Sequence, residues 1–143
     1  MIYFPKIRKI FIISLILSTF IACDDQDDWI PNVRVDKWMD LNTELAPLGL
    51  LQARIIPQEG VNGILLFRLA DREFNAFDRT CSFQPSRNCA VEFDESELKA
   101  SCPCCESEFE LFYSGGVQKG PAKRPLKQYR TTIQGNMLRI TNF

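Results

Sequence analysis

The stretch CPCCESEF, residues 102–109, places three cysteines within four positions and is the most informative segment of the chain. Two further cysteines, Cys81 and Cys89, lie upstream of it. A C-x-x-C pair, here Cys102 and Cys105, that faces another cysteine-bearing loop is typical of a site for a soft metal ion or an iron–sulfur cluster. In an oxidising compartment the same spacing can form disulfides instead. The spacing alone leaves both interpretations open.

The composition is that of a globular protein with one domain at most. The chain has 143 residues, of which 45% are hydrophobic and 24% are charged, so it can form a core. Histidine is absent, which excludes His-based acid–base catalysis, Ser-His-Asp and Cys-His nucleophiles and His-ligated metal sites. Glu106, Glu108 and Glu110 alternate along one strand face, but no nucleophile or substrate pocket is indicated beside them. We therefore expect no enzymatic activity.

The first 22 residues have the organisation of a secretory signal. An uncharged apolar run, residues 10–22, is long enough for the core of a signal peptide and short for a membrane-spanning helix. The positive segment before it consists of Lys6, Arg8 and Lys9.

The end of this run resembles the lipoprotein box of bacteria, because the small residue Ala22 directly precedes Cys23. Phe20 departs from the Leu that is usual in that box. The resemblance implies a signal peptide over residues 1–22, lipidation of Cys23 and membrane attachment through this lipid anchor. An ordinary cleaved leader is the alternative. We expect a protein of the bacterial cell envelope, either periplasmic or surface-exposed.

Acidic residues dominate the segment after Cys23, which reads DDQDD over residues 24–28. Such a segment is solvated, and we assign residues 23–31 to an acidic tether and residues 32–143 to the folded domain. Without the leader the chain has 14 basic and 18 acidic side chains, a net charge of about −4. This balance gives no indication of a nucleic-acid partner.

Short β-like runs separated by turn signals follow one another through the folded part. Asn62-Gly63 is a strong signal for a tight turn before one of them. No long helical period occurs, so the pattern favours an all-β sandwich or small barrel. The expected strands cover residues 33–35, 50–56, 64–69, 74–77, 90–93, 98–100, 109–113, 128–133 and 137–141.

Two cysteine loops between short antiparallel strands, followed by Gly-Pro-Ala at residues 120–122, resemble the Rieske iron–sulfur domain. That family holds a 2Fe–2S cluster between a C-x-H loop and a C-P-x-H-G-S loop, with two cysteines on one iron and two histidines on the other. The resemblance covers roughly residues 50–143. It implies a Rieske-like antiparallel β-sandwich or small barrel of short strands with both cysteine loops at one end.

In the first loop of this resemblance, Cys81 falls on the ligand cysteine and Phe83 on the histidine. In the second loop, Cys102 falls on the ligand cysteine, Cys105 on the second histidine and Glu106 on the glycine.

Some members of the family carry one further cysteine in each loop, joined as a disulfide. Cys89 and Cys104 correspond to this pair.

A 2Fe–2S cluster in this chain would need a fourth thiolate, because Phe83 has no donor atom. The predicted ligand set is therefore Cys81, Cys89, Cys102 and Cys105, with electron transfer to a redox partner or another envelope protein as the function. Ligation by four thiolates would lower the reduction potential of the cluster below that of a Rieske cluster with histidine ligands, toward about −400 mV.

Two other interpretations of the cysteines stay open. One is a structural zinc ion on the same four thiols. The other is a binding or structural module without metal, in which Cys89–Cys104 and one bridge from Cys81 to Cys102 or Cys105 are disulfides.

Overall fold

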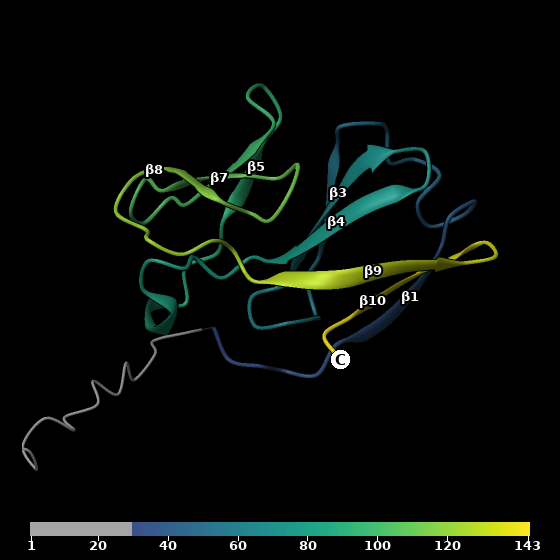
Figure 1. The fold of residues 1–143 in the computed structure, drawn as a ribbon, viewed down its shortest axis with the longest axis horizontal. Coiled ribbons are helices and arrows are strands. Elements are labelled where there is room, and N and C mark those ends of the chain that lie inside the picture. Colours follow the sequence, from purple (N-terminus) through teal and green to yellow (C-terminus); the bar gives the residue numbers. More distant parts are fainter. Residues whose placement is uncertain (1–29) are drawn as a thin grey trace, which may run out of the picture.

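The computed structural model describes residues 30–143, which fold into two antiparallel β-sheets (Figure 1). The larger sheet has the strand order β1-β10-β9-β4-β3-β2, and the smaller one runs β5-β6-β7-β8. The only helical segment within these residues is the single 3-10 turn η1 (Pro85–Arg87). The predicted all-β class is confirmed. The strands are β1 (Asp36–Asp40), β2 (Ala53–Ile56), β3 (Ile64–Ala70), β4 (Glu73–Asp78), β5 (Glu92–Asp94), β6 (Lys99–Ser101), β7 (Glu108–Glu110), β8 (Val117–Lys119), β9 (Gln128–Gln134) and β10 (Met137–Thr141).

The predicted signal peptide, Cys23 and all but the last two residues of the predicted tether lie outside the described residues. Across residues 30–143, no helix has the length and apolar character needed to cross a membrane.

Strand β3 lies between two hydrophobic cores. Its residues 64–67 are fully buried, because successive side chains of a strand point to opposite faces and both faces are covered here. Ile64 and Leu66 belong to the first core, together with residues of β1, β4, β9 and β10. Leu65 and Phe67 belong to the second core. A run of four apolar residues in the sequence therefore serves two packing layers at once.

The second core connects the two sheets and underlies the cysteine loops. Phe77 of β4 and Phe109 of β7 are fully buried in it, next to Leu126 from the loop before β9. Cys81 and Cys102 belong to the same core and are almost fully buried. Cys81 and Cys102 therefore pack against apolar side chains of the second core.

The first strand begins later than the sequence pattern predicts. Val35 is fully buried but Val33 is 43% exposed, and β1 starts at Asp36. The backbone N–H of Val35 donates to Oδ1 of Asn142 at 3.0 Å. The acceptor of this hydrogen bond is therefore a side chain and not the backbone of a neighbouring strand.

Strand β7 is shorter than predicted, and β8 was not predicted. The Glu110 carboxylate accepts hydrogen bonds from the backbone N–H groups of Tyr113, Ser114 and Gly116, which turns the chain directly after β7. The returning segment Val117–Lys119 then pairs with β7, although three residues are too few to show a strand pattern in the sequence.

We expect the replacement Leu66→Ala to lower the free energy of unfolding by about 3 kcal/mol, because it leaves a cavity in a fully packed core. Urea denaturation measures this loss. Leu50→Ala is the control, since Leu50 is 60% exposed and should lose less than about 0.5 kcal/mol. Equal losses in the two variants would contradict the assigned core.

Candidate metal centre

The first cysteine loop, residues 79–91, leaves β4 and returns toward β5. Two features close its base: the β-bridge between Thr80 and Ala90, and a hydrogen bond from the N–H of Cys81 to the carbonyl of Cys89 at 2.8 Å. Cys81 and Cys89 therefore lie side by side at the two ends of the loop, with η1 between them.

The second cysteine loop, residues 102–107, connects β6 to β7. The N–H of Cys102 donates to the carbonyl of Ser107 at 2.8 Å, and the N–H of Glu106 donates to the carbonyl of Cys102 at 2.9 Å. Glu106 has a φ of 59°, a left-handed conformation that glycine adopts without strain. The turn that the family makes with glycine is thus present here with a glutamate.

A third loop, residues 120–126, packs against both cysteine loops. A Cβ atom on Gly120 would lie 2.5 Å from Cα of Ser107, so only glycine permits this approach. The Ser107 hydroxyl accepts from the N–H of Ala122 at 3.1 Å, and the Ser82 hydroxyl donates to the carbonyl of Arg124 at 2.6 Å. All three loops are therefore fastened together at one end of the second core.

The Sγ atoms of Cys81, Cys102 and Cys105 lie within 4.8 Å of one another. The Sγ atoms of Cys81 and Cys105 are in contact at 3.5 Å. Cys81 and Cys102 are buried and Cys105 is partly exposed, so the cluster opens to solvent on the side of Cys105. The predicted convergence of the two loops is present.

Cys89 and Cys104 form a disulfide with a Cα–Cα distance of 6.4 Å. This is the pairing that the Rieske resemblance implies. It corrects the predicted four-thiolate ligand set, because the sulfur of Cys89 is bonded to Cys104 and cannot serve as a thiolate. The same correction applies to a zinc ion on those four thiols. Of the second bridges considered, neither Cys81–Cys102 nor Cys81–Cys105 is formed.

Cys81 and Cys105 have different proton affinities. Burial, followed by a hydrogen bond with Cys102, raises the pKa of Cys81 far above its usual range. Burial also opposes ionisation of Cys105, but hydrogen bonds from the Ser107 side chain and backbone outweigh it and lower the pKa of Cys105. Cys105 therefore ionises more readily than Cys81, and metal binding would displace the thiol protons.

A small cavity of about 10 Å³ lies at the thiols. Phe83, at the position of the family's first histidine, is 38% exposed. Gln84 was not singled out in the sequence, although its position three residues after Cys81 was a usable signal. The cavity is lined by Cys81, Phe83, Gln84, Arg87, Cys89, Cys102, Cys104 and Cys105.

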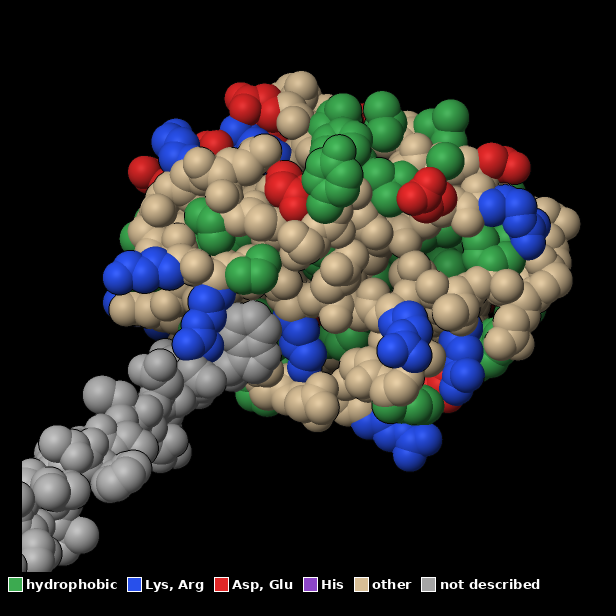
Figure 2. Space-filling model, viewed as in Figure 1, with side chains coloured by type: hydrophobic (Ala, Val, Ile, Leu, Met, Phe, Trp, Pro, Cys, Tyr) green, Lys and Arg blue, Asp and Glu red, His purple; other side chains and the backbone are tan. Residues whose placement is uncertain are grey.

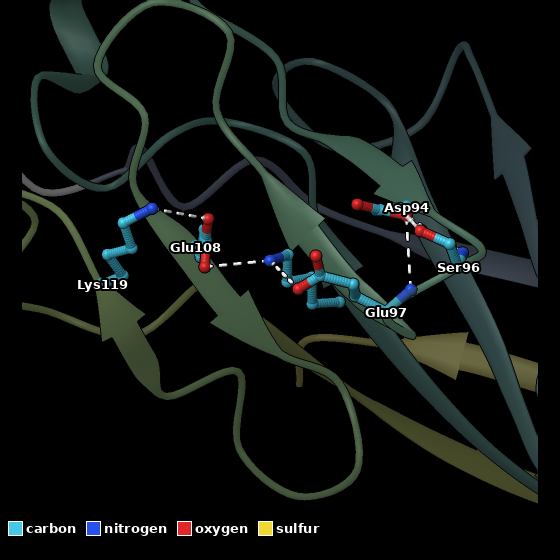
Figure 3. A network of polar contacts seen from close by, with 6 residues as sticks. Asp94, Ser96, Glu97, Glu108 and Lys119 are labelled. Carbon is cyan, nitrogen blue, oxygen red and sulfur yellow. Dashed lines mark hydrogen bonds and ion pairs between the residues drawn. The ribbon is translucent and has the colours of Figure 1, made fainter.

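The acidic residues near the second loop have structural partners. Glu108 forms ion pairs with Lys99 at 3.0 Å and with Lys119 at 3.3 Å, and Glu97 also forms an ion pair with Lys99 (Figure 3). The hydrogen bond from Lys99 lowers the pKa of Glu108. Burial raises the pKa of Glu110, but its backbone donors outweigh that effect and lower it. Neither carboxyl group is suited to act as a general acid near neutral pH.

Charge is unevenly distributed over the surface. On the face shown in Figure 2, most Lys and Arg side chains lie in the lower half, where β9 crosses the view, and acidic side chains lie mainly toward the upper edge. Because Lys119 is paired with Glu108, the basic and acidic segments are in part mutually neutralised.

No protein-family model matches this sequence, and no curated protein matches it. Similarity appears among solved structures. The ferredoxin of carbazole 1,9a-dioxygenase from Nocardioides aromaticivorans IC177 has a TM-score of 0.51 at 18% identity, over 76% of this chain and 94% of that one. A chain from the complex of reduced oxygenase and oxidized ferredoxin in carbazole 1,9a-dioxygenase has a TM-score of 0.52 at 15% identity, over 73% and 92%.

The chain has a Rieske-like fold. A further similar structure is the cyanobacterial plasma membrane Rieske protein of Synechocystis PCC 6803, with 29% identity and a TM-score of 0.47 over 55% of this chain and 75% of that one. The fold expected from the two cysteine loops is thus confirmed.

The cysteines of this Rieske-like domain do not fit the family's cluster. A Rieske cluster has two protein ligands on each of two irons. Cys81 and Cys102 would hold one iron, whereas the second would have Cys105 alone, because Phe83 has no donor atom. The sulfurs also do not separate into two ends, since the 3.5 Å contact joins Cys81 to Cys105, which the cluster would place on different irons.

The same sulfurs fit a single ion better. Thiolates bound tetrahedrally to one ion at about 2.3 Å lie about 3.8 Å apart. The three Sγ atoms, gathered within 4.8 Å, need only small movements to reach that spacing.

Removing the disulfide should lower the free energy of unfolding by about 3 kcal/mol, because it closes a loop across 15 positions of sequence. The double variant Cys89→Ser/Cys104→Ser tests this by urea denaturation of metal-free protein. Cys105→Ser, which removes a thiol from the same loop without breaking a bridge, should lose less than about 1 kcal/mol. A double variant as stable as the unaltered chain would refute the assigned role of the bridge.

Replacing the left-handed residue Glu106 by glycine should raise the free energy of unfolding by about 0.5–1 kcal/mol, because the strain of a Cβ atom in this conformation exceeds the entropy cost of glycine. Thermal unfolding compares Glu106→Gly with Glu95→Gly, a turn position outside the left-handed region. If Glu95→Gly raises the free energy of unfolding and Glu106→Gly does not, the second loop has a different conformation.

Proposed function

We propose that this protein is a lipid-anchored envelope protein that binds a single iron ion through Cys81, Cys102 and Cys105 and transfers one electron at a time, without catalysing a reaction of its own. The observation that carries the proposal is the coexistence of two cysteine states at the same loops. One pair of cysteines is bonded as a disulfide, while three others converge unbonded.

Thiolate chemistry favours a metal ion at these sulfurs. Three buried or half-buried thiolates repel one another, and a cation removes both that repulsion and the cost of burying charge. Thiolate sulfur selects zinc, iron and copper(I) over magnesium or calcium. A further disulfide would use two of the three thiols and leave the third unpaired.

The fold supports iron over zinc. Zinc has no redox chemistry, whereas a bound iron ion supplies a one-electron couple. A solved neighbour is a ferredoxin described in complex with an oxygenase, and a comparable protein partner is part of the proposal for this chain. An ion held by Cys81, Cys102 and Cys105 would supply the one-electron couple for exchange with such a partner.

The residues of the chain have separate roles in this function. Cys81 and Cys102 anchor the ion in the second core and exclude water from it, since both are almost fully buried. Cys105 lies on the solvent side, where a partner can approach. Ser107 fixes the position of Cys105 through the Sγ–Oγ hydrogen bond of 3.2 Å. The lipid anchor, proposed from residues 1–23, would keep the centre near a membrane.

Structural zinc is the second candidate, because the same three thiols would hold it and the sulfur spacing suits either ion. Such a protein would use the centre to join its two loops and would carry no electrons.

We expect the full chain, purified anaerobically in detergent, to contain one iron per chain and no acid-labile sulfide. Elemental analysis and sulfide assay measure this content. The oxidised protein should absorb visible light through thiolate-to-iron charge transfer, and dithionite should bleach that absorption. Cys105→Ser should lose most of the iron, since it removes one of three thiolates.

The double variant Cys89→Ser/Cys104→Ser is the matched control, because it removes two cysteines but leaves the three proposed ligands in place. It should keep more iron than Cys105→Ser, because all three proposed ligands remain, although loss of the bridge weakens binding. A content of two irons and two sulfides per chain would show that the site holds a 2Fe–2S cluster and not a single ion. One zinc would support the structural alternative, and a metal-free, colourless chain would refute both.

A further inference from the structure

The first cysteine loop contributes one more residue with a potential ligand atom to the cavity at the thiols. Gln84 lines the same cavity as Cys81, Cys102 and Cys105. Its side-chain Oε1 atom is buried and has no hydrogen-bond partner among residues 30–143. It is the only such side-chain atom in that part of the chain. Because buried oxygen atoms of this kind nearly always accept a hydrogen bond, an unpartnered one beside three thiols indicates a missing ligand.

The local backbone fixes the position of Gln84 in the first cysteine loop. Pro85 begins the 3-10 turn η1, and the backbone carbonyl of Gln84 accepts from the N–H of Arg87 at 3.0 Å. The turn ends at Asn88 in a left-handed conformation, which brings the chain back to Cys89. The Gln84 backbone is thus held in place while Oε1 of its side chain has no hydrogen-bond partner among residues 30–143.

We propose that Oε1 of Gln84 is the fourth ligand of a single transition-metal ion held by Cys81, Cys102 and Cys105, an inference that rests on the proposed metal-binding function. Three thiolates and one amide oxygen complete the tetrahedral set for which Phe83 supplies no atom. A neutral oxygen also adds no charge to a centre that already has three thiolates.

Other residues at the cavity fit this role less well. Glu106 is exposed and does not line the cavity. Arg87 lines it but is a cation, which offsets the negative charge of the thiolates and does not bind the metal. Cys89 and Cys104 are bonded to each other. Among the described residues that line the cavity, Gln84 is therefore the one with a buried, unpartnered side-chain oxygen.

Cobalt(II) is a suitable probe, because its visible spectrum reports both the number of thiolates and the coordination geometry. The full chain in detergent, with the three thiols reduced and the Cys89–Cys104 disulfide verified by mass spectrometry, is titrated against a chelator of known affinity. We expect one equivalent of cobalt and a tetrahedral spectrum. Gln84→Leu should weaken binding at least tenfold and shift the d–d bands, because water replaces the amide oxygen.

Gln58→Leu is the matched control, since it makes the same chemical change at an exposed turn and should leave affinity and spectrum unaltered. Gln84→Cys is the second variant and should add a fourth thiolate, seen as stronger sulfur-to-cobalt charge transfer. If the unaltered chain binds no cobalt, the proposed metal-binding function fails. If it binds cobalt and both Gln84 variants keep its affinity and spectrum, only the ligand assignment fails.

Discussion

The disulfide between Cys89 and Cys104 is the covalent connection between the two cysteine loops, and the geometry of the thiols depends on it. Each loop belongs to a different part of the fold, since the first follows β4 of the larger sheet and the second joins β6 to β7 of the smaller one. Loops of this length would otherwise be free to separate, and ordering them costs conformational entropy. With the bridge in place, that entropy is already lost before any ion binds. The second core below and the loop of residues 120–126 beside them restrict the remaining freedom.

This Rieske-like scaffold is retained although two of its characteristic positions carry other residues. Glu106 keeps the left-handed turn that glycine makes without strain, so the path of the second loop is preserved at an energetic cost. Phe83 removes a donor, yet the loop around it is intact, with its bridge at the base and its 3-10 turn at the tip. The fold and the ligand set therefore depend on different residues. This explains how a similar architecture can surround a centre with another coordination.

Sequence patterns predicted β3, β4, β9 and β10 best, with bounds within one residue of those observed. They failed at β1 and β8, where a hydrogen bond from the Val35 backbone to Oδ1 of Asn142 and a three-residue pairing define the structure. The spacing of the cysteines was enough to predict which loops meet. It was not enough to decide which sulfurs bond, because that depends on distances of a few ångströms between residues far apart in sequence. The position of Gln84 three residues after Cys81 was a signal in the sequence, but the burial of its unpartnered oxygen is visible only in three dimensions.

The disulfide and the free thiols also constrain each other chemically. The sulfur of Cys102 lies 3.8 Å from the sulfur of Cys89, close enough for a thiolate at Cys102 to attack the bridge and release Cys104. Such an exchange would leave Cys81, Cys104 and Cys105 as the free set and would destroy the arrangement of donors. A metal ion on Cys102 would prevent the attack, because a coordinated sulfur is a weaker nucleophile than a free thiolate. The bridge would position the ligands for such an ion, and the bound ion would in turn protect the bridge from exchange.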